Sequence, residues 1–181
     1  MTRGRVEIVS TAELTARARE LSQIPADEGH DLREQTALVV WQLAGEYFGA
    51  AVHLVREVIA DPVVTALPMA PPIVAGVINV RGDILTVVNL DRALDLPESQ
   101  RASRFAIVVH DHDIRAAMLV DQVDGVEWFT AQREPVIATV AAEHARFLGG
   151  AYRSGTRMVT EINVTAVLAH PQLQPPGDGP A

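Results

Sequence analysis

The sequence contains no cysteine and no lysine. Without cysteine, disulfide bonds, thiolate nucleophiles and cysteine-ligated metal sites are all excluded. Without lysine, the chain cannot supply the lysine that a phosphate-binding P-loop requires. All 15 basic residues are therefore arginines, a bias that we attribute to genome composition.

Aromatic residues and long apolar runs are also scarce. Only 4% of the 181 residues are aromatic, although 48% are hydrophobic and 21% are charged. This balance predicts a globular domain, or two small barrels sharing a core, rather than a disordered chain. No stretch approaches the ~18 apolar residues of a membrane helix, and no apolar run follows Arg3 and Arg5. We expect a cytoplasmic protein without direct membrane insertion.

The formal net charge of −8 argues against a nucleic-acid partner, because phosphate binding needs a basic surface. No G-x-S-x-G elbow is present, and nothing places two carboxylates in one cleft. The nearest approach to a metal site is the stretch His110, Asp111, His112 and Asp113. A site would need a third ligand, so a solvated turn is the favoured interpretation. We predict no catalytic residue, no metal and no cofactor; a small metal-dependent enzyme using His110 and His112 is the disfavoured alternative.

Residues 76–90 predict the β-hairpin around which the chain is organised. Apolar and β-branched residues flank Arg81-Gly82-Asp83, where the glycine supplies the positive φ of a tight turn. An arginine at this turn can bind a carboxylate with its guanidinium fork. Glu57 offers one from residues 54–59, whose apolar spacing predicts a helical turn. A Glu57–Arg81 pair can serve recognition, or simply tie that turn to the hairpin.

The rest of the chain predicts short strands with glycine- or proline-rich breaks. A capping-box spacing from Ser10 predicts a helix over residues 10–23, followed by a polar linker over 27–34. Residues 121–127 fail the calcium-loop pattern and predict a strand entry with a bulge, and Trp128 and Phe129 are predicted in the core. Strands are predicted at 37–43, 47–52, 63–67, 104–110, 114–120, 126–129, 147–152 and 158–162, helical segments at 91–96 and 164–169, and helix or loop at 138–146.

The two halves of the sequence share a loose internal repeat. Arg81-Gly82, a strand, and Asn89-Leu90 correspond to Ser154-Gly155, a strand, and Asn163-Val164. This repeat predicts two similar small barrels, because closed barrels remove exposed strand edges.

Four stretches, in this order, resemble the CheW-like domain of bacterial chemotaxis coupling proteins. They are V-R-E-V-I at 55–59, G-V-I-N-V-R-G-D-I-L-T-V-V-N-L at 76–90, L-V-D-Q-V-D-G-V at 119–126, and residues 147–168 beginning F-L-G-G. The resemblance implies a mainly β fold of two SH3-like five-stranded β-barrels sharing a core, with short helices and a C-terminal helix. It covers residues 37–169, which we take as the CheW-like domain. The capping pattern before this domain predicts an N-terminal helical extension (1–36), and the proline and glycine content after it predicts a disordered tail (170–181).

The resemblance further implies a non-catalytic adaptor that couples the cytoplasmic tip of chemoreceptors to the regulatory domain of a CheA-type histidine kinase. Such a protein is expected to be a monomer in isolation and to join membrane receptor arrays through its protein partners. The implied kinase-facing surface lies on the second barrel, and its residues are not assigned. The implied receptor-binding groove contains Val55, Glu57, Gly76, Arg81 and Val88. Gly76 has an alternative interpretation, a backbone position that cannot hold a Cβ.

Three residues depart from the family pattern. Thr86 and Asn89 stand where the family has a proline and then an aspartate, and Glu161 stands where an apolar residue is usual. Asparagine can keep the turn hydrogen bonds of an aspartate without its charge, so we expect the fold to survive. Glu161 predicts an exposed strand face or an altered contact. A specialised paralogue for a non-chemotaxis sensory pathway, with the N-terminal helix binding a further partner, is therefore the main alternative.

Overall fold

The computed structural model describes residues 8–10, 35–97, 104–130 and 142–173. Short strands dominate, as the turn-rich sequence predicts. The strands are β1 (Ile8–Ser10), β2 (Gln35–Leu43), β3 (Glu46–Ala51), β4 (Val55–Ala60), β5 (Val74–Val80), β6 (Asp83–Asn89), β7 (Phe105–Asp111), β8 (Ile114–Val120), β9 (Gln122–Thr130), β10 (Leu148–Ser154) and β11 (Arg157–Ile162). The helical segments are η2 (Val52–Leu54), α2 (Leu90–Ala93), η3 (Ala142–Phe147), α3 (Val164–Leu168) and η4 (Pro171–Leu173).

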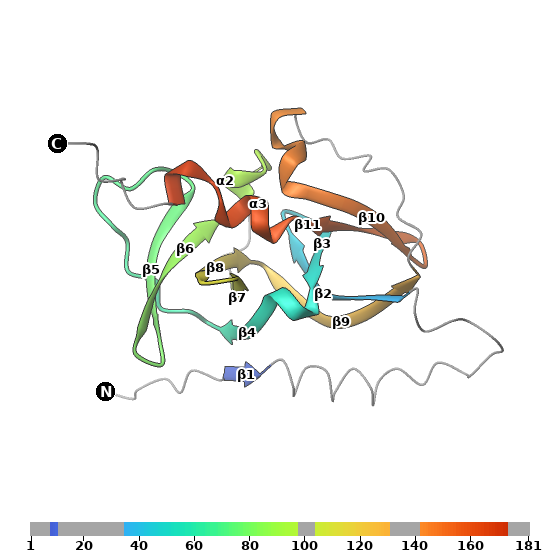
Figure 1. The fold of residues 1–181 in the computed structure, drawn as a ribbon, viewed down its shortest axis with the longest axis horizontal. Helices are drawn as coiled ribbons and strands as arrows, with labels where there is room; N and C mark the ends of the chain where they lie inside the picture. The colour runs from blue at the N-terminus through green and yellow to red at the C-terminus, as the bar shows by residue number, and fades with distance from the viewer. Residues whose placement is uncertain (1–7, 11–34, 98–103, 131–141, 174–181) are drawn as a thin grey trace.

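The strands form two sheets that lie side by side, with α3 between them (Figure 1). The first has the order β1-β4-β7-β8-β6-β5 and the second the order β10-β11-β3-β2-β9. Apart from β1, each sheet therefore has five strands, and the fold is the mainly β, two-barrel SH3-like architecture that the resemblance implied. The strand β1 was not predicted and adds a sixth strand beside β4.

The two sheets repeat one pairing scheme. In the first sheet β6 runs parallel to β8, and in the second β11 runs parallel to β3. The outer strands β4 and β9 also correspond, and each carries a bulge, as do the hairpin strands β5 and β10. The backbone amides of Asn89 and Asn163 close both hairpins by donating to the carbonyls of Ile73 and Phe147. The repeat between the two halves of the sequence is thus confirmed.

One apolar core joins the two sheets. Trp41 and Phe48 of the second sheet pack in the same cluster as Val58 and Ile107 of the first, and Leu168 of α3 completes it. Burial of these side chains is the main favourable term in folding. The sharing of a core, implied by the resemblance, is confirmed.

Three predictions about local structure are wrong. Residues 55–59 form strand β4 rather than a helical turn, because their amides and carbonyls pair with β7 on one side and β1 on the other. Residues 63–67 make only an isolated bridge, Thr65 to Val77. The stretch around them is rich in proline, which has no backbone amide to donate to a neighbouring strand. Trp128 is 46% exposed while Phe129 is buried, since neighbouring residues of a strand face opposite sides.

Several other predictions fall wholly or partly outside the described residues. These are the helix at 10–23, apart from Ser10, the linker at 27–34, and most of the segment at 138–146. Of the C-terminal segment predicted to be disordered, Pro171–Leu173 form the short helix η4, and residues 174–181 are not described. Within the part of the chain that is described, no helix is long and apolar enough to span a membrane.

Candidate functional site

Arg81 stands at the tip of the central hairpin. Strand β5 ends at Val80 and β6 begins at Asp83, so Arg81 and Gly82 form a two-residue turn with φ values of 55° and 100°. Positive φ at both central positions is the geometry of a type I′ turn, which matches the twist of the flanking strands. The Gly82 amide donates to Oδ1 of Asn79 at 2.9 Å and holds the turn closed. A non-glycine residue in this conformation is strained, and the turn fixes where its side chain begins.

Glu57 of β4 accepts a hydrogen bond from Arg81, with 3.2 Å between Nη2 and Oε2. A bulge between Val55 and Glu57 sets the position of the carboxylate on β4. The Glu57 side chain is 6% exposed, whereas that of Arg81 is 64% exposed. The buried carboxylate therefore positions the guanidinium, and the exposed side of the fork remains accessible to a carboxylate on another molecule. The pair that the sequence suggested is present.

The other three residues of the predicted groove have no exposed side chain. Val55 and Val88 are 3% and 0% exposed and belong to the shared core. Gly76 has a φ of 146°, and a Cβ there would lie 2.2 Å from the carbonyl oxygen of Thr65. These residues shape the hairpin and its support, and of the five residues of the predicted groove Arg81 alone has an exposed side chain.

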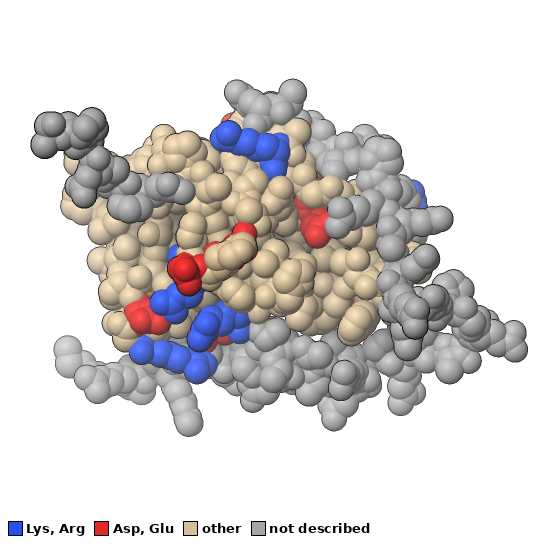
Figure 2. All heavy atoms as spheres, viewed as in Figure 1, with Lys and Arg blue, Asp and Glu red and all other residues tan. Residues whose placement is uncertain are grey.

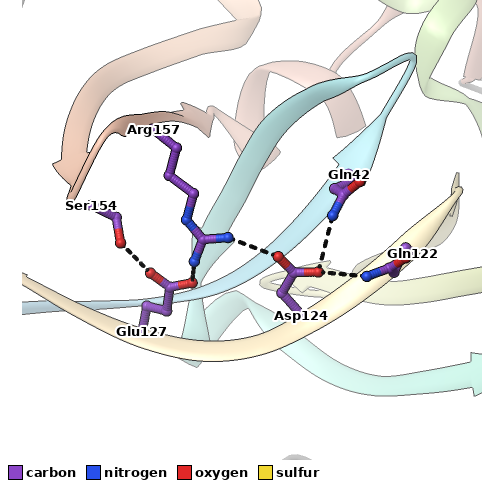
Figure 3. A network of polar contacts seen from close by, with 6 residues as sticks. All are labelled: Gln42, Gln122, Asp124, Glu127, Ser154 and Arg157. Carbon is purple, nitrogen blue, oxygen red and sulfur yellow. Dashed lines mark hydrogen bonds and ion pairs between the residues drawn. The ribbon is translucent and has the colours of Figure 1, made fainter.

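A second arginine cluster lies on the other sheet (Figure 3). Arg157 of β11 pairs with Asp124 at 2.9 Å and with Glu127, both on β9. Ser154 of β10 donates to Glu127 at 2.8 Å, and the guanidinium also lies 4.7 Å from the centre of the Tyr47 ring. Partial burial would lower the pKa of Arg157, but the Glu127 carboxylate and hydrogen bonds outweigh it and raise that pKa. Two glutamines, Gln42 and Gln122, donate to Asp124.

The two arginines hold equivalent parts of the two sheets together. Strands β9 and β10 are the two ends of the second sheet, and the contacts of Glu127 with Ser154 and Arg157 join its β9 end to the β10–β11 hairpin. Glu57 on β4 and Arg81 on the β5–β6 hairpin make the corresponding junction in the first. Sequence analysis assigned Asp124 and Glu127 to a bulge and missed Arg157. The internal repeat matches Arg81-Gly82 with Ser154-Gly155, so it pointed to this hairpin but not to Arg157 itself.

The hairpin tips of the first sheet also carry exposed apolar side chains. Ile84 and Ile114 are 63% and 49% exposed, and the neighbouring residues Asp83 and Arg115 form an ion pair at 2.8 Å. On the face drawn in Figure 2, charged side chains of both signs gather most densely near the far end of the β5–β6 hairpin, and most of the remaining described surface is uncharged. This end of the molecule therefore combines apolar and charged groups.

The turn at residues 110–113 makes structural contacts. Oδ2 of Asp111 accepts from the Thr165 hydroxyl at 2.5 Å, which ties β7 to α3, and Asp111 lies 2.7 Å from Nδ1 of His112. The Thr165 hydrogen bond lowers the pKa of Asp111 below its ordinary value, and His112 adds to this against the opposing effect of desolvation. Among the described residues, no group of three or more histidine or acidic side chains is arranged to hold a metal ion.

The side chain of Asn89 acts as a hydrogen-bond donor, a role that an aspartate could not fill. Its side chain makes no capping hydrogen bond to α2; instead, Nδ2 donates to the Pro72 carbonyl at 3.2 Å. The Oε2 of Glu161 accepts a hydrogen bond from the Tyr152 hydroxyl at 3.1 Å. Thr86 lies in β6 between β5 and β8, where it pairs with Val77 and Ala116.

Asn89→Asp should lower the free energy of unfolding by about 1 kcal/mol, because it replaces a donor by a carboxylate that faces a carbonyl oxygen. Asn163→Asp is the matched control. Asn163 accepts from the Ala166 amide at the start of α3, a role that aspartate can fill. Urea unfolding at pH 7 measures both variants. Equal stability of Asn89→Asp and the unaltered chain would mean that the Pro72 contact contributes nothing.

Comparison with known proteins places this geometry in a family. The CheW-like domain matches residues 37–172. The chain is 26% identical to "Chemotaxis protein CheW" of Treponema pallidum over 150 residues, which cover 78% of this chain and 86% of that protein. It is 34% identical to "Protein PilI" of Pseudomonas aeruginosa over 102 residues, which cover 53% of this chain and 57% of that one.

A solved structure gives the same result. The scaffolding protein TtCheW of Thermoanaerobacter tengcongensis superposes with a TM-score of 0.62 at 26% identity, over 70% of this chain and 88% of that chain. The family match covers more than half of the sequence and includes both sheets apart from β1 and the first two residues of β2. The chain therefore belongs to the family of proteins with a CheW-like domain, which are non-catalytic scaffolds.

Proposed function

We propose that this protein is an adaptor that couples chemoreceptors to a CheA-type histidine kinase, and that Arg81 is the centre of its receptor-binding surface. The observation that carries the proposal is the Arg81 turn: a strained type I′ hairpin presents a 64% exposed guanidinium that a buried Glu57 holds from behind. A positioned arginine loses little freedom when it binds a partner carboxylate. Relatives named for chemotaxis and a neighbour described as a scaffolding protein support the assignment.

An adaptor needs a second surface, which we assign to the second sheet. There Trp128 is 46% exposed on β9, directly after Glu127 of the Arg157 cluster. Exposed tryptophan is enriched at protein interfaces, where it supplies a large rigid contact. We therefore propose Trp128 as a contact for the kinase regulatory domain. The adaptor then acts on the cytoplasmic side of receptor arrays through two surfaces that multivalent assembly reinforces.

Arg81→Ala should weaken binding of a receptor tip about tenfold or more, because it removes a charge-assisted contact. Affinity for the kinase regulatory domain should stay unchanged. Isothermal titration against each partner from the same organism measures both. Arg81→Lys should recover only part of the receptor affinity, since lysine keeps the charge without the planar fork.

Arg104→Ala is the matched control, because the Arg104 side chain is similarly exposed (70%) and its one ion pair within the described part of the chain is a long 3.9 Å contact with Asp61. It should bind both partners normally. If Arg81→Ala and Arg104→Ala bind the receptor tip equally well, Arg81 is not part of the receptor surface. Failure of the unaltered chain to bind either partner would overturn the adaptor function itself.

A specialised coupling paralogue in a non-chemotaxis sensory pathway is the second candidate. It is favoured by 34% identity to PilI, a relative not named for chemotaxis, and by the presence of Asn89 and Glu161 where the family pattern has other residues. Titration against the tips of all receptors of the same organism separates the two: exclusive binding of a receptor whose deletion leaves chemotaxis intact supports the paralogue.

A further inference from the structure

Strand β1 lies outside the part of the chain that matches the CheW-like domain. That match begins at residue 37, whereas β1 comprises Ile8–Ser10. It pairs antiparallel with β4, and the partners are Ile8 with Ile59, Val9 with Val58, and Ser10 with Glu57. In the first sheet, a segment from the N-terminal extension thus occupies the edge that β4 would otherwise present (Figure 1).

An uncovered β4 edge would be a site for strand addition. An edge strand presents a row of backbone donors and acceptors that any extended segment can pair with. Among the described residues, strand β1 pairs with this row at three positions, so release of the described strand breaks few pairings. The corresponding outer strand of the second sheet, β9, also has a bulge and a side-chain junction to the neighbouring hairpin, but no further described strand pairs with its outer edge.

The structure itself shows which segment pairs with the β4 edge. It is Ile-Val-Ser at residues 8–10, and every copy of this chain carries that segment. Residues 11–34 join β1 to β2, and a connection of this length has an upper reach of roughly 80 Å at ~3.3 Å per residue. That reach allows the segment to pair with β4 of its own chain or with β4 of a neighbouring copy.

We propose that the β4 edge is an exchangeable strand-addition site whose occupant is Ile8–Ser10, from the same chain in dilute solution and from a second copy where copies are crowded. After exchange, β1 of one copy pairs with β4 of the other copy in the same register as within one chain. The N-terminal extension then links the two copies. Because both contacts are the same surface, reciprocal exchange closes a two-fold dimer. Crowding in a receptor array rests on the proposed function, but the exchange itself does not.

Concentration decides between the two forms. A tethered segment acts at an effective concentration on the order of 1 mM, so pairing within the chain dominates when copies are dilute. Pairing between copies becomes competitive only as their local concentration nears that value. This predicts a monomer in dilute solution and linked copies when the protein is concentrated.

The cysteine-free sequence provides a direct test by disulfide trapping. Antiparallel partners have Cα separations of about 4.5–5.5 Å, which a disulfide can bridge. The full-length double variant Val9→Cys/Val58→Cys should close within one chain on oxidation at about 1 µM, far below the tethered concentration. Two single variants, Val9→Cys with an affinity tag and untagged Val58→Cys, are then mixed, so that only exchange between copies can join residue 9 to residue 58.

The mixed variants should give a reducible heterodimer whose yield rises at least about tenfold between about 1 µM and about 1 mM. The control pairs Val9→Cys with Ile59→Cys, one residue out of register, where neighbouring strand residues face opposite sides. Thermal unfolding verifies that each variant is folded. A heterodimer no more abundant than this control overturns exchange, and failure of the double variant to close within one chain overturns the docking. Neither result depends on binding to a receptor or a kinase, which the Arg81 titrations test separately.

Discussion

Gly76→Ala should lower the free energy of unfolding by roughly 3 kcal/mol or more, the largest effect that we expect from any single methyl group in the chain. Two costs add. The φ of 146° is one that side-chain-bearing residues rarely adopt, and the new Cβ would lie 2.2 Å from the Thr65 carbonyl oxygen. That carbonyl accepts from the Val77 amide, so the backbone cannot move away without breaking the bridge between residues 65 and 77.

Gly125→Ala separates the two costs. Gly125 has a φ of 126°, but nothing lies within 4 Å of a Cβ built there. It should therefore lose only about 1–2 kcal/mol, the cost of the backbone conformation. Urea unfolding followed by circular dichroism measures both variants. If the two alanines cost the same, the contact with Thr65 is not a constraint, and the proline-rich stretch yields to the new side chain.

Gly76 also bears on how the receptor surface must be tested. Since its substitution damages β5 and the turn that follows, loss of binding by Gly76→Ala would report on folding rather than contact. Val55 and Val88 carry the same difficulty, because both are in the core. Substitution of Arg81 should not damage folding in this way, because its side chain is 64% exposed and the turn that it occupies also tolerates glycine. Arg81→Gly therefore removes the guanidinium while relieving the backbone.

The sequence predicted those parts of the fold that short-range chemistry determines. The turn at Arg81-Gly82 and the repeat of Asn89 in Asn163 are local patterns, and both are present. The types of residue predict the Glu57–Arg81 pair, although the same sequence predicts a helical turn where Glu57 lies in a strand. Apolar residues in V-R-E-V-I fit either periodicity, and only pairing with β7 and β1 decides for a strand.

The parts that could not be predicted depend on contacts between distant segments. The sequence around Ile8–Ser10 has no alternation long enough to indicate a strand, and β1 exists because β4 has an edge to fill. Trp128 is exposed because pairing of β9 with β2 directs Phe129 inward. Arg157 lies 30 residues from Glu127, and its role follows from the joining of opposite ends of a sheet, which no local pattern encodes.

Arg157→Met should lower the free energy of unfolding by about 2–3 kcal/mol, less than for a fully buried pair because the groups are partly solvated. Methionine retains apolar contact with the Tyr47 ring but leaves the carboxylates of Asp124 and Glu127 without the guanidinium that they share. Their side chains are only 17% and 24% exposed, so water cannot fully replace the guanidinium. Urea unfolding at low and high salt measures the loss, which should shrink as salt screens the carboxylate repulsion.

Two further variants test whether charge or packing is responsible. Arg115→Met removes an arginine from a single, more exposed pair with Asp83, and it should cost less than about 1 kcal/mol. Adding Asp124→Asn and Glu127→Gln to Arg157→Met removes both stranded charges, and it should restore part of the stability. A triple variant less stable than Arg157→Met would mean that the acidic groups stabilise the junction of β9 with the β10–β11 hairpin without their arginine. Recovery would instead show that Arg157 acts by neutralising them, and that this junction depends on one cation shared by two carboxylates.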